Sequence, residues 1–125
     1  MNSRDGLGLK ILRFWFPFIL YSAIIFYVSS LSDDQTPHIG HFDKIVHIVE
    51  FMPFGFLLTR AFCRTSSFLW NTIAIGVVLL SFLYGASDEF HQSFIEGRES
   101  ALADAFADAI GGAIGVYVYK KLRVK

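Results

Sequence analysis

The segment SFLWNTIAIGVVLLSFLYGA, residues 67–86, decides the fold class of this chain. It carries no charged residue, and a helix of this length, rising about 1.5 Å per residue, crosses roughly 30 Å of hydrocarbon. A soluble domain of 125 residues must present polar surface to water, whereas 54% of this chain is hydrophobic and 17% is aromatic. The segment therefore predicts a transmembrane helix in an integral membrane protein.

Three further apolar runs of similar length occupy residues 14–31, 45–62 and 101–119. The first follows a basic start, as a cleaved signal peptide would, but it is long for a signal core and no small-residue cleavage site follows it. A membrane span must satisfy its backbone hydrogen bonds internally, and a few strands cannot close a barrel. We therefore predict an all-α fold, a four-transmembrane-helix bundle that forms a single domain over residues 1–125.

Basic residues set the orientation predicted for this bundle. Nine of the eleven Lys and Arg residues fall on one side: before the first span, between the second and third, or after the fourth. The positive-inside rule assigns this side to the cytoplasm, so both termini are expected there. The nine residues are Arg4, Lys10, Arg13, Arg60, Arg64, Lys120, Lys121, Arg123 and Lys125.

Charge and cysteine content exclude other classes of protein. The net charge is zero and no basic stripe lies on a soluble face, so no nucleic-acid partner is predicted. Cys63 is the only cysteine, which excludes an internal disulfide and a cysteine-based zinc cluster. Membrane lipids are the expected surroundings of the chain.

Three clusters of polar residues lie on the opposite, extracytoplasmic side of the predicted bundle. In the first, spacings of i, i+4 and i+7 place Asp43, His47 and Glu50 on one helix face. The second has a helical pattern up to about Phe94, and the third is an i, i+4 pair of acids. The clusters comprise Asp43, Lys44, His47 and Glu50; Asp88, Glu89, His91, Gln92 and Arg98; and Asp104 and Asp108.

Ionisable side chains inside a membrane span require an explanation. Near the bilayer centre each costs about 2.5–3.5 kcal/mol on insertion scales, and somewhat less in the outer half of a span. A structural network of ion pairs is one explanation, but ten acids on this side face only two Lys or Arg residues, Lys44 and Arg98. Protonated carboxyls, a bound cation or a cationic ligand group would relieve this surplus. The sequence therefore predicts a functional polar pocket that opens outward.

Several kinds of chemistry fit such a pocket. Two i, i+3 pairs of donors would suit a metal ion, but no H-E-x-x-H or H-x-x-E-H motif occurs, and we predict no metal site. Ser87 and Ser93 lack the glycines of a nucleophile elbow, which argues against serine chemistry. General acid–base catalysis by Asp88, Glu89 and His91 fits the pattern. The residues expected to bind substrate are Asp43, Lys44, His47, Glu50, Gln92, Arg98, Asp104 and Asp108.

Non-catalytic functions fit the same residues, so the sequence leaves open whether the protein is an enzyme, and it identifies no cofactor. Arg98 could hold a phosphate-bearing head group without any catalysis. Transport is a less favoured alternative, because four short spans lack the inverted repeat typical of transporters.

Small residues on the fourth span predict close helix packing. Gly111 and Gly115 form a G-x-x-x-G motif next to Gly112, and such residues let another helix approach closely. The partner is either a neighbouring helix of the same chain or a second copy in a homo-oligomer.

One string of residues is specific enough to indicate a family. It consists of Asp43-Lys44-x-x-His47-x-x-x-Phe51, then Ser87-Asp88-Glu89-x-His91-Gln92-x-Phe94-x-x-Gly97-Arg98, then Asp104 with Gly111, Gly112 and Gly115. Over roughly residues 40–116 the chain resembles the VanZ-like family. It departs from the family where Glu96 replaces a frequent proline and where Asp108 replaces a frequent asparagine.

The resemblance implies an integral protein of the bacterial cytoplasmic membrane, acting in the cell envelope. The founding member of the family is associated with low-level resistance to the glycopeptide teicoplanin, and no catalytic role follows from this for any residue here. With the predicted pocket, the resemblance suggests a protein that binds or acts on a lipid-linked or phosphorylated envelope component through its head group.

Overall fold

The structure, a computed structural model, describes residues 3–31, 43–95 and 101–123; for residues 3–5 and 43 it describes the backbone only. The elements are α1 (Ser3–Ser29), α2 (Asp43–Thr65), α3 (Trp70–Gln92) and α4 (Leu102–Arg123). No strand occurs among the described residues. Each helix is long and apolar enough to cross a membrane. The prediction of an all-α bundle with four transmembrane helices is therefore confirmed.

The helices extend beyond the predicted apolar spans. α1 begins at Ser3 instead of residue 14, because a helix can continue out of the hydrocarbon while its polar side chains reach the head-group region. α3 begins at Trp70, three residues later than predicted, since Leu69 before it adopts an extended conformation. Its other end runs on to Gln92, through the polar segment whose pattern predicted a helix.

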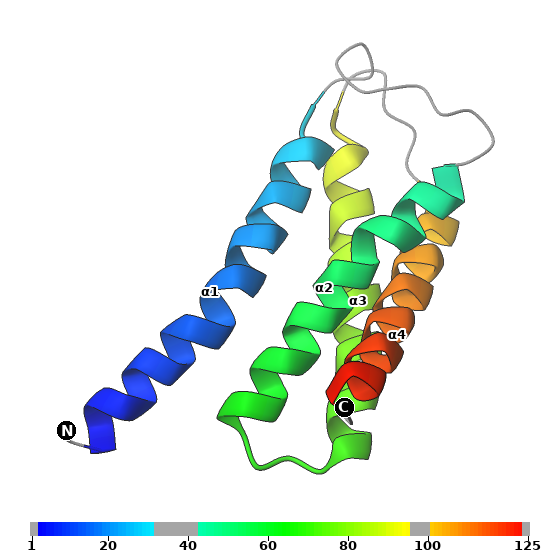
Figure 1. Cartoon of the computed structure of the whole chain (residues 1–125). Coiled ribbons are helices and arrows are strands. Elements are labelled where there is room, and N and C mark those ends of the chain that lie inside the picture. The colour runs from blue at the N-terminus through cyan, green and yellow to red at the C-terminus, as the bar shows by residue number, and fades with distance from the viewer. Residues whose placement is uncertain (1–2, 32–42, 96–100, 124–125) are drawn as a thin grey trace.

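The helices alternate in direction, so that the N-terminus, the link between α2 and α3, and the end of α4 lie at one end of the bundle (Figure 1). α2 and α4 run in parallel and have the most extensive contact, followed by α3 with α4. α1 leans away from the other helices towards its N-terminus (Figure 1). Only 6% of its most apolar stretch is buried, against 50% for α4. The bundle is therefore a tight group of α2, α3 and α4 with α1 docked at its side.

Glycines make the close contact between α2 and α4. A Cβ atom added to Gly55 would overlap the backbone of Gly112, and Cβ atoms at Gly111 and Gly115 would overlap carbonyl oxygens of α2. Substitution of any of the three would force the helix backbones apart. The small-residue face of α4 thus packs inside the chain, where it is not available to a second copy.

The core lies among α1, α2, α3 and α4 and is rich in aromatic residues. The rings of Phe54 and Tyr84 stack with centroids 5.1 Å apart. The buried cluster consists of Ile25, Phe51, Phe54, Leu58, Ile73, Val77 and Val116. Large apolar side chains also cover the outward faces of the helices, as expected for surfaces in contact with lipid; they include Leu20, Leu79, Leu83 and Ile110.

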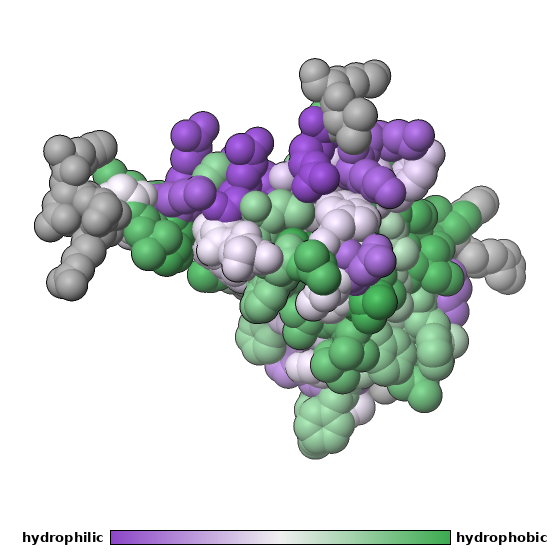
Figure 2. All heavy atoms as spheres, turned by 90° about the horizontal axis from the view of Figure 1, so that it is seen from below, coloured by the Kyte–Doolittle hydropathy of each residue, from purple (hydrophilic) through white to green (hydrophobic). Residues whose placement is uncertain are grey.

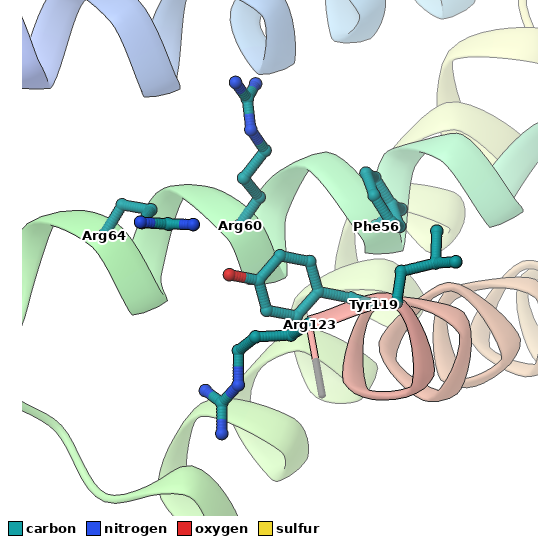
Figure 3. Close-up of a pocket in the computed structure, with 6 residues that line it drawn as sticks. Phe56, Arg60, Arg64, Tyr119 and Arg123 are labelled. Atoms are coloured by element: carbon teal, nitrogen blue, oxygen red, sulfur yellow. The ribbon is translucent and has the colours of Figure 1, made fainter. Parts of the chain in front are cut away.

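Basic residues gather at the end of the bundle that carries the termini. Figure 2 shows hydrophilic side chains along one edge of this end, beside a largely hydrophobic surface. A pocket of about 270 Å³ opens here between α2 and α4 (Figure 3), lined by Phe56, Arg60, Arg64, Tyr119, Leu122 and Arg123.

The guanidinium groups of this pocket rest on aromatic rings. The Tyr119 ring lies between Arg60 and Arg123, whose guanidinium groups point in opposite directions (Figure 3). Arg60 lies 4.7 Å from the centroid of the Phe14 ring, and Arg123 lies 5.2 Å from that of Trp70. Cation–π contacts and the positive-inside rule account for these arginines without a bound ligand.

Cysteine labelling will test the predicted orientation. In a Cys63→Ser background, we expect single cysteines at positions 41 and 98 to react with an impermeant maleimide added outside the cell. A cysteine at position 64 is expected to react only after the membrane is opened, because the basic residues should be cytoplasmic. Labelling of position 64 from outside would invert the topology and place the polar clusters in the cytoplasm.

Candidate functional site

A cluster of ionisable side chains lies between α2, α3 and α4, at the end of the bundle opposite the termini. It is built where α2 begins, α3 ends and α4 begins (Figure 1). Its members are Lys44 and His47 from α2, Asp88 and Glu89 from α3, and Asp104 and Asp108 from α4. We call these six residues the polar cluster.

The parallel packing of α2 on α4 pairs two bases with two acids. The Lys44 ammonium contacts Asp104, and the Nδ1 atom of His47 lies 2.9 Å from Oδ1 of Asp108. On the other side of its ring, Nε2 of His47 lies 3.6 Å from Oδ2 of Asp104. His47 therefore sits between two carboxyl groups, and its contact with Asp108 at Nδ1 orients the ring.

α3 adds two more buried carboxylates. Asp88 and Glu89 are 7% and 4% exposed. The Oε2 atom of Glu89 accepts a hydrogen bond of 2.9 Å from the backbone N–H of Ala101, just before α4 begins. Glu89 thereby supplies an acceptor to the start of α4, where backbone N–H groups lack partners within the helix.

Oε1 of Glu89 and Oδ2 of Asp108 are buried and have no hydrogen-bond partner among the described residues. Gly85 lies against Asp108, and a Cβ atom at this position would overlap Oδ2. The glycine at position 85 thus leaves room for the Asp108 carboxyl group, although the surrounding hydrogen bonds do not satisfy both of its oxygens. Buried unpaired charge is strongly unfavourable, so these oxygens point to a bound proton or cation.

Three members of the polar cluster are arranged so that they could hold a metal ion. His47, Glu89 and Asp104 each offer one ligand atom, and these three atoms lie within 4.8 Å of one another. All three residues are buried, and each comes from a different helix.

His91 and Gln92 face α1. The Nε2 atom of His91 is 2.9 Å from the Ser30 hydroxyl, and its ring stacks on Phe26 with centroids 4.6 Å apart. Gln92 donates a hydrogen bond of 3.1 Å to the hydroxyl of Ser29. Among the described residues, His47 is the histidine that lies within 4 Å of a carboxylate. The group best placed for proton transfer is thus His47, which the sequence assigned to substrate binding.

The other predicted site residues lie at the margin of the polar cluster or outside the described residues. Glu50 is half-buried, and its carbonyl oxygen accepts a hydrogen bond of 2.5 Å from the hydroxyl of Tyr21 on α1. Asp43 opens α2, but its side chain is not among those described, and Arg98 lies in the undescribed segment 96–100. The substrate-binding roles expected for these residues stay predictions.

Sequence reasoning missed Gly55 and Gly85. Gly55 admits the backbone of α4, and Gly85 admits the side chain of Asp108. The sequence does contain an indication for Gly85, because this residue lies one helical turn before Glu89 and therefore on the same face of α3.

Comparison with known proteins agrees with the resemblance seen in the motif residues. The model of the VanZ/LLP1 family matches residues 12–123, which include α2, α3, α4 and most of α1. No curated protein and no solved structure matches the chain. Because the family model covers most of the sequence and the whole polar cluster, the chain belongs to the VanZ/LLP1 family.

Proposed function

We propose that this protein acts in the bacterial cytoplasmic membrane, where it binds the polar head of a lipid-linked or phosphorylated envelope component. The polar cluster receives the head group, and His47 exchanges a proton with it. The observation that carries the proposal is the position of His47, which is 8% exposed and lies between Asp104 and Asp108.

The chemistry of the cluster supports proton transfer. Nδ1 of His47 lies 2.9 Å from Oδ1 of Asp108. In the tautomer that donates from Nδ1 to this carboxylate, Nε2 is the basic nitrogen. A buried imidazole held by a carboxylate is a common general base or acid. Asp104 lies beside Nε2 and stabilises the imidazolium when the ring takes up a proton.

The position of the cluster supports a head-group ligand. It occupies helix ends, whereas the outward faces of the helices are covered by apolar side chains. The side chain of Lys44 is 49% exposed while its ammonium group contacts Asp104. A cation that is half-exposed at the edge of a buried acidic cluster can meet a phosphate at the level of the lipid head groups.

A head-group assay on purified protein in lipid nanodiscs will test this function. Polyprenyl phosphates and phospholipids are supplied separately, and both binding and conversion to product are measured. We expect the wild-type protein to bind at least one of these lipids and Asp104→Asn to weaken binding at least tenfold. An absence of binding and turnover with all of these lipids would overturn the proposal.

The same experiment separates an enzyme from a binding protein. Product formation that requires His47 supports catalysis, whereas saturable binding without product supports the second candidate, a non-catalytic modulator of the envelope. The role in teicoplanin resistance belongs to this proposal. It predicts that a bacterium expressing the protein tolerates more teicoplanin than one expressing Asp104→Asn at equal abundance.

A further inference from the structure

We propose that His47, Glu89 and Asp104 bind a divalent metal ion that accepts mixed nitrogen and oxygen donors, with Zn²⁺ as the preferred ion. This inference rests on the proposed function for its head-group ligand. Nε2 of His47 cannot bind a metal and accept a proton at the same time, so in the metal-bound protein the ion takes the place of the exchanging proton. The sequence alone predicted no metal site, because the three ligands come from three different helices and form no local motif.

The spacing of the ligand atoms fits a metal. Two ligands that each lie about 2.1 Å from a tetrahedral zinc ion are about 3.4 Å apart. Nε2 of His47 and Oδ2 of Asp104 are 3.6 Å apart, a distance that is long for a hydrogen bond between them. The Glu89 ligand atom lies within 4.8 Å of both, so a small rotation of this side chain completes a three-residue site.

His47 also has the outer partner typical of a metal ligand. Metal-binding histidines almost always donate their second ring N–H to a carboxylate, a backbone carbonyl or water. Asp108 takes this role at 2.9 Å from Nδ1, which leaves Nε2 facing Asp104. Asp108 is fully buried, and Gly85 makes the room for it. Three helices thus contribute to the orientation of the ring.

A cation would also satisfy the buried acid of α3. Oε1 of Glu89 is buried with no hydrogen-bond partner among the described residues, while Oε2 is already used by the Ala101 N–H. A buried carboxylate oxygen in this state favours a directly bound cation. The imidazole donor favours Zn²⁺ over Mg²⁺, which prefers an all-oxygen shell with several waters. A bound metal would further offset the excess of acids and allow an anionic head group to approach.

A substitution of Lys44 distinguishes a metal site from a network of ion pairs. Its ammonium group contacts Asp104 and therefore competes with a metal for this carboxylate. If the cluster binds Zn²⁺, Lys44→Gln removes the competitor and tightens binding. If the cluster serves only to pair charges, the same substitution removes one of its two bases and creates no metal affinity.

Zinc titration of EDTA-stripped protein in nanodiscs, followed by calorimetry, tests the inference. We expect one Zn²⁺ to bind per chain, at least tenfold more tightly than Mg²⁺. Glu89→Gln and Asp104→Asn should each raise the Kd for Zn²⁺ at least tenfold, and Lys44→Gln should lower it several-fold. Because the chain has four histidines, a variant that lacks His38, His41 and His91 serves as the control and should keep the site.

The outcomes distinguish this inference from the proposed function. No Zn²⁺ binding, or binding that is lost in the control variant and unaffected by Glu89→Gln, would overturn the metal site. Head-group binding that persists in EDTA would then leave the proposed function standing. Zinc binding with the expected pattern but without any head-group ligand would overturn the proposed function alone. Tryptophan fluorescence of each variant will confirm that it is folded, and Glu89→Gln decides the question if Asp104→Asn does not fold.

Discussion

His47→Ala is expected to lower head-group binding or turnover at least about 100-fold, which corresponds to about 2.7 kcal/mol. His47 is the group through which the acids of α4 act, since one ring nitrogen lies beside Asp108 and the other beside Asp104. Its removal takes away the group that carries the proton. It also removes one partner from each of the buried carboxyl groups of Asp104 and Asp108, which is unfavourable. The nanodisc assay with polyprenyl phosphates and phospholipids measures the effect.

His91→Ala is the matched control for this prediction. His91 belongs to the same family motif, but it stacks on Phe26 and pairs with Ser30 of α1. We expect its substitution to change binding or turnover less than about threefold and to affect mainly the docking of α1. If His91→Ala lowered binding or turnover more than His47→Ala did, in variants of equal abundance, the reactive group would lie on the side of α3 that faces α1.

Gly55→Ala is expected to lower the free energy of unfolding by at least about 2 kcal/mol, near the upper part of the range for overpacked cores. The added methyl group meets three backbone atoms of Gly112, and a backbone cannot rotate aside as a side chain can. The only relief is separation of α2 from α4, which also parts Lys44 from Asp104. Unfolding by SDS in mixed micelles, followed by tryptophan fluorescence, measures the change.

Gly76→Ala on α3 provides the comparison for the same chemical change. A Cβ atom at Gly76 meets no atom within 4 Å, so the methyl group enters open space. The higher helix propensity of alanine should make this variant as stable as the wild type or more stable, by up to about 1 kcal/mol. Equal losses for the two substitutions would show that α2 and α4 do not approach as closely as described.

Much of the fold could be predicted because lipid imposes simple rules. The charge-free segment 67–86 and three similar runs give four helices by length alone. The helix ends were harder to predict, since hydropathy marks the hydrocarbon and not the end of the helix. α3 therefore continues six residues past residue 86 to Gln92, and α1 starts well before Phe14.

The candidate site was predictable in composition and less so in arrangement. Spacing along one helix correctly grouped Asp104 with Asp108, because i and i+4 share a face. It could not show which face of α3 meets α1, and that contact separates His91 from the carboxylates. Spacing along one helix also could not show that His47 lies opposite Asp108, since this pairing depends on the offset of α2 relative to α4 along the helix axes.

Because α2 and α4 run in parallel along their length, the site forms only when the residues of both helices keep their positions around the two helix axes. Lys44 pairs with a residue 60 positions later and His47 with one 61 positions later, while Phe56 meets Tyr119 at the far end. One residue inserted between Asp108 and Gly111 would turn the acids by about 100° relative to the glycines. Insertions and deletions should therefore be confined to the connections between helices, and any change of length within one helix would need a compensating change in the other.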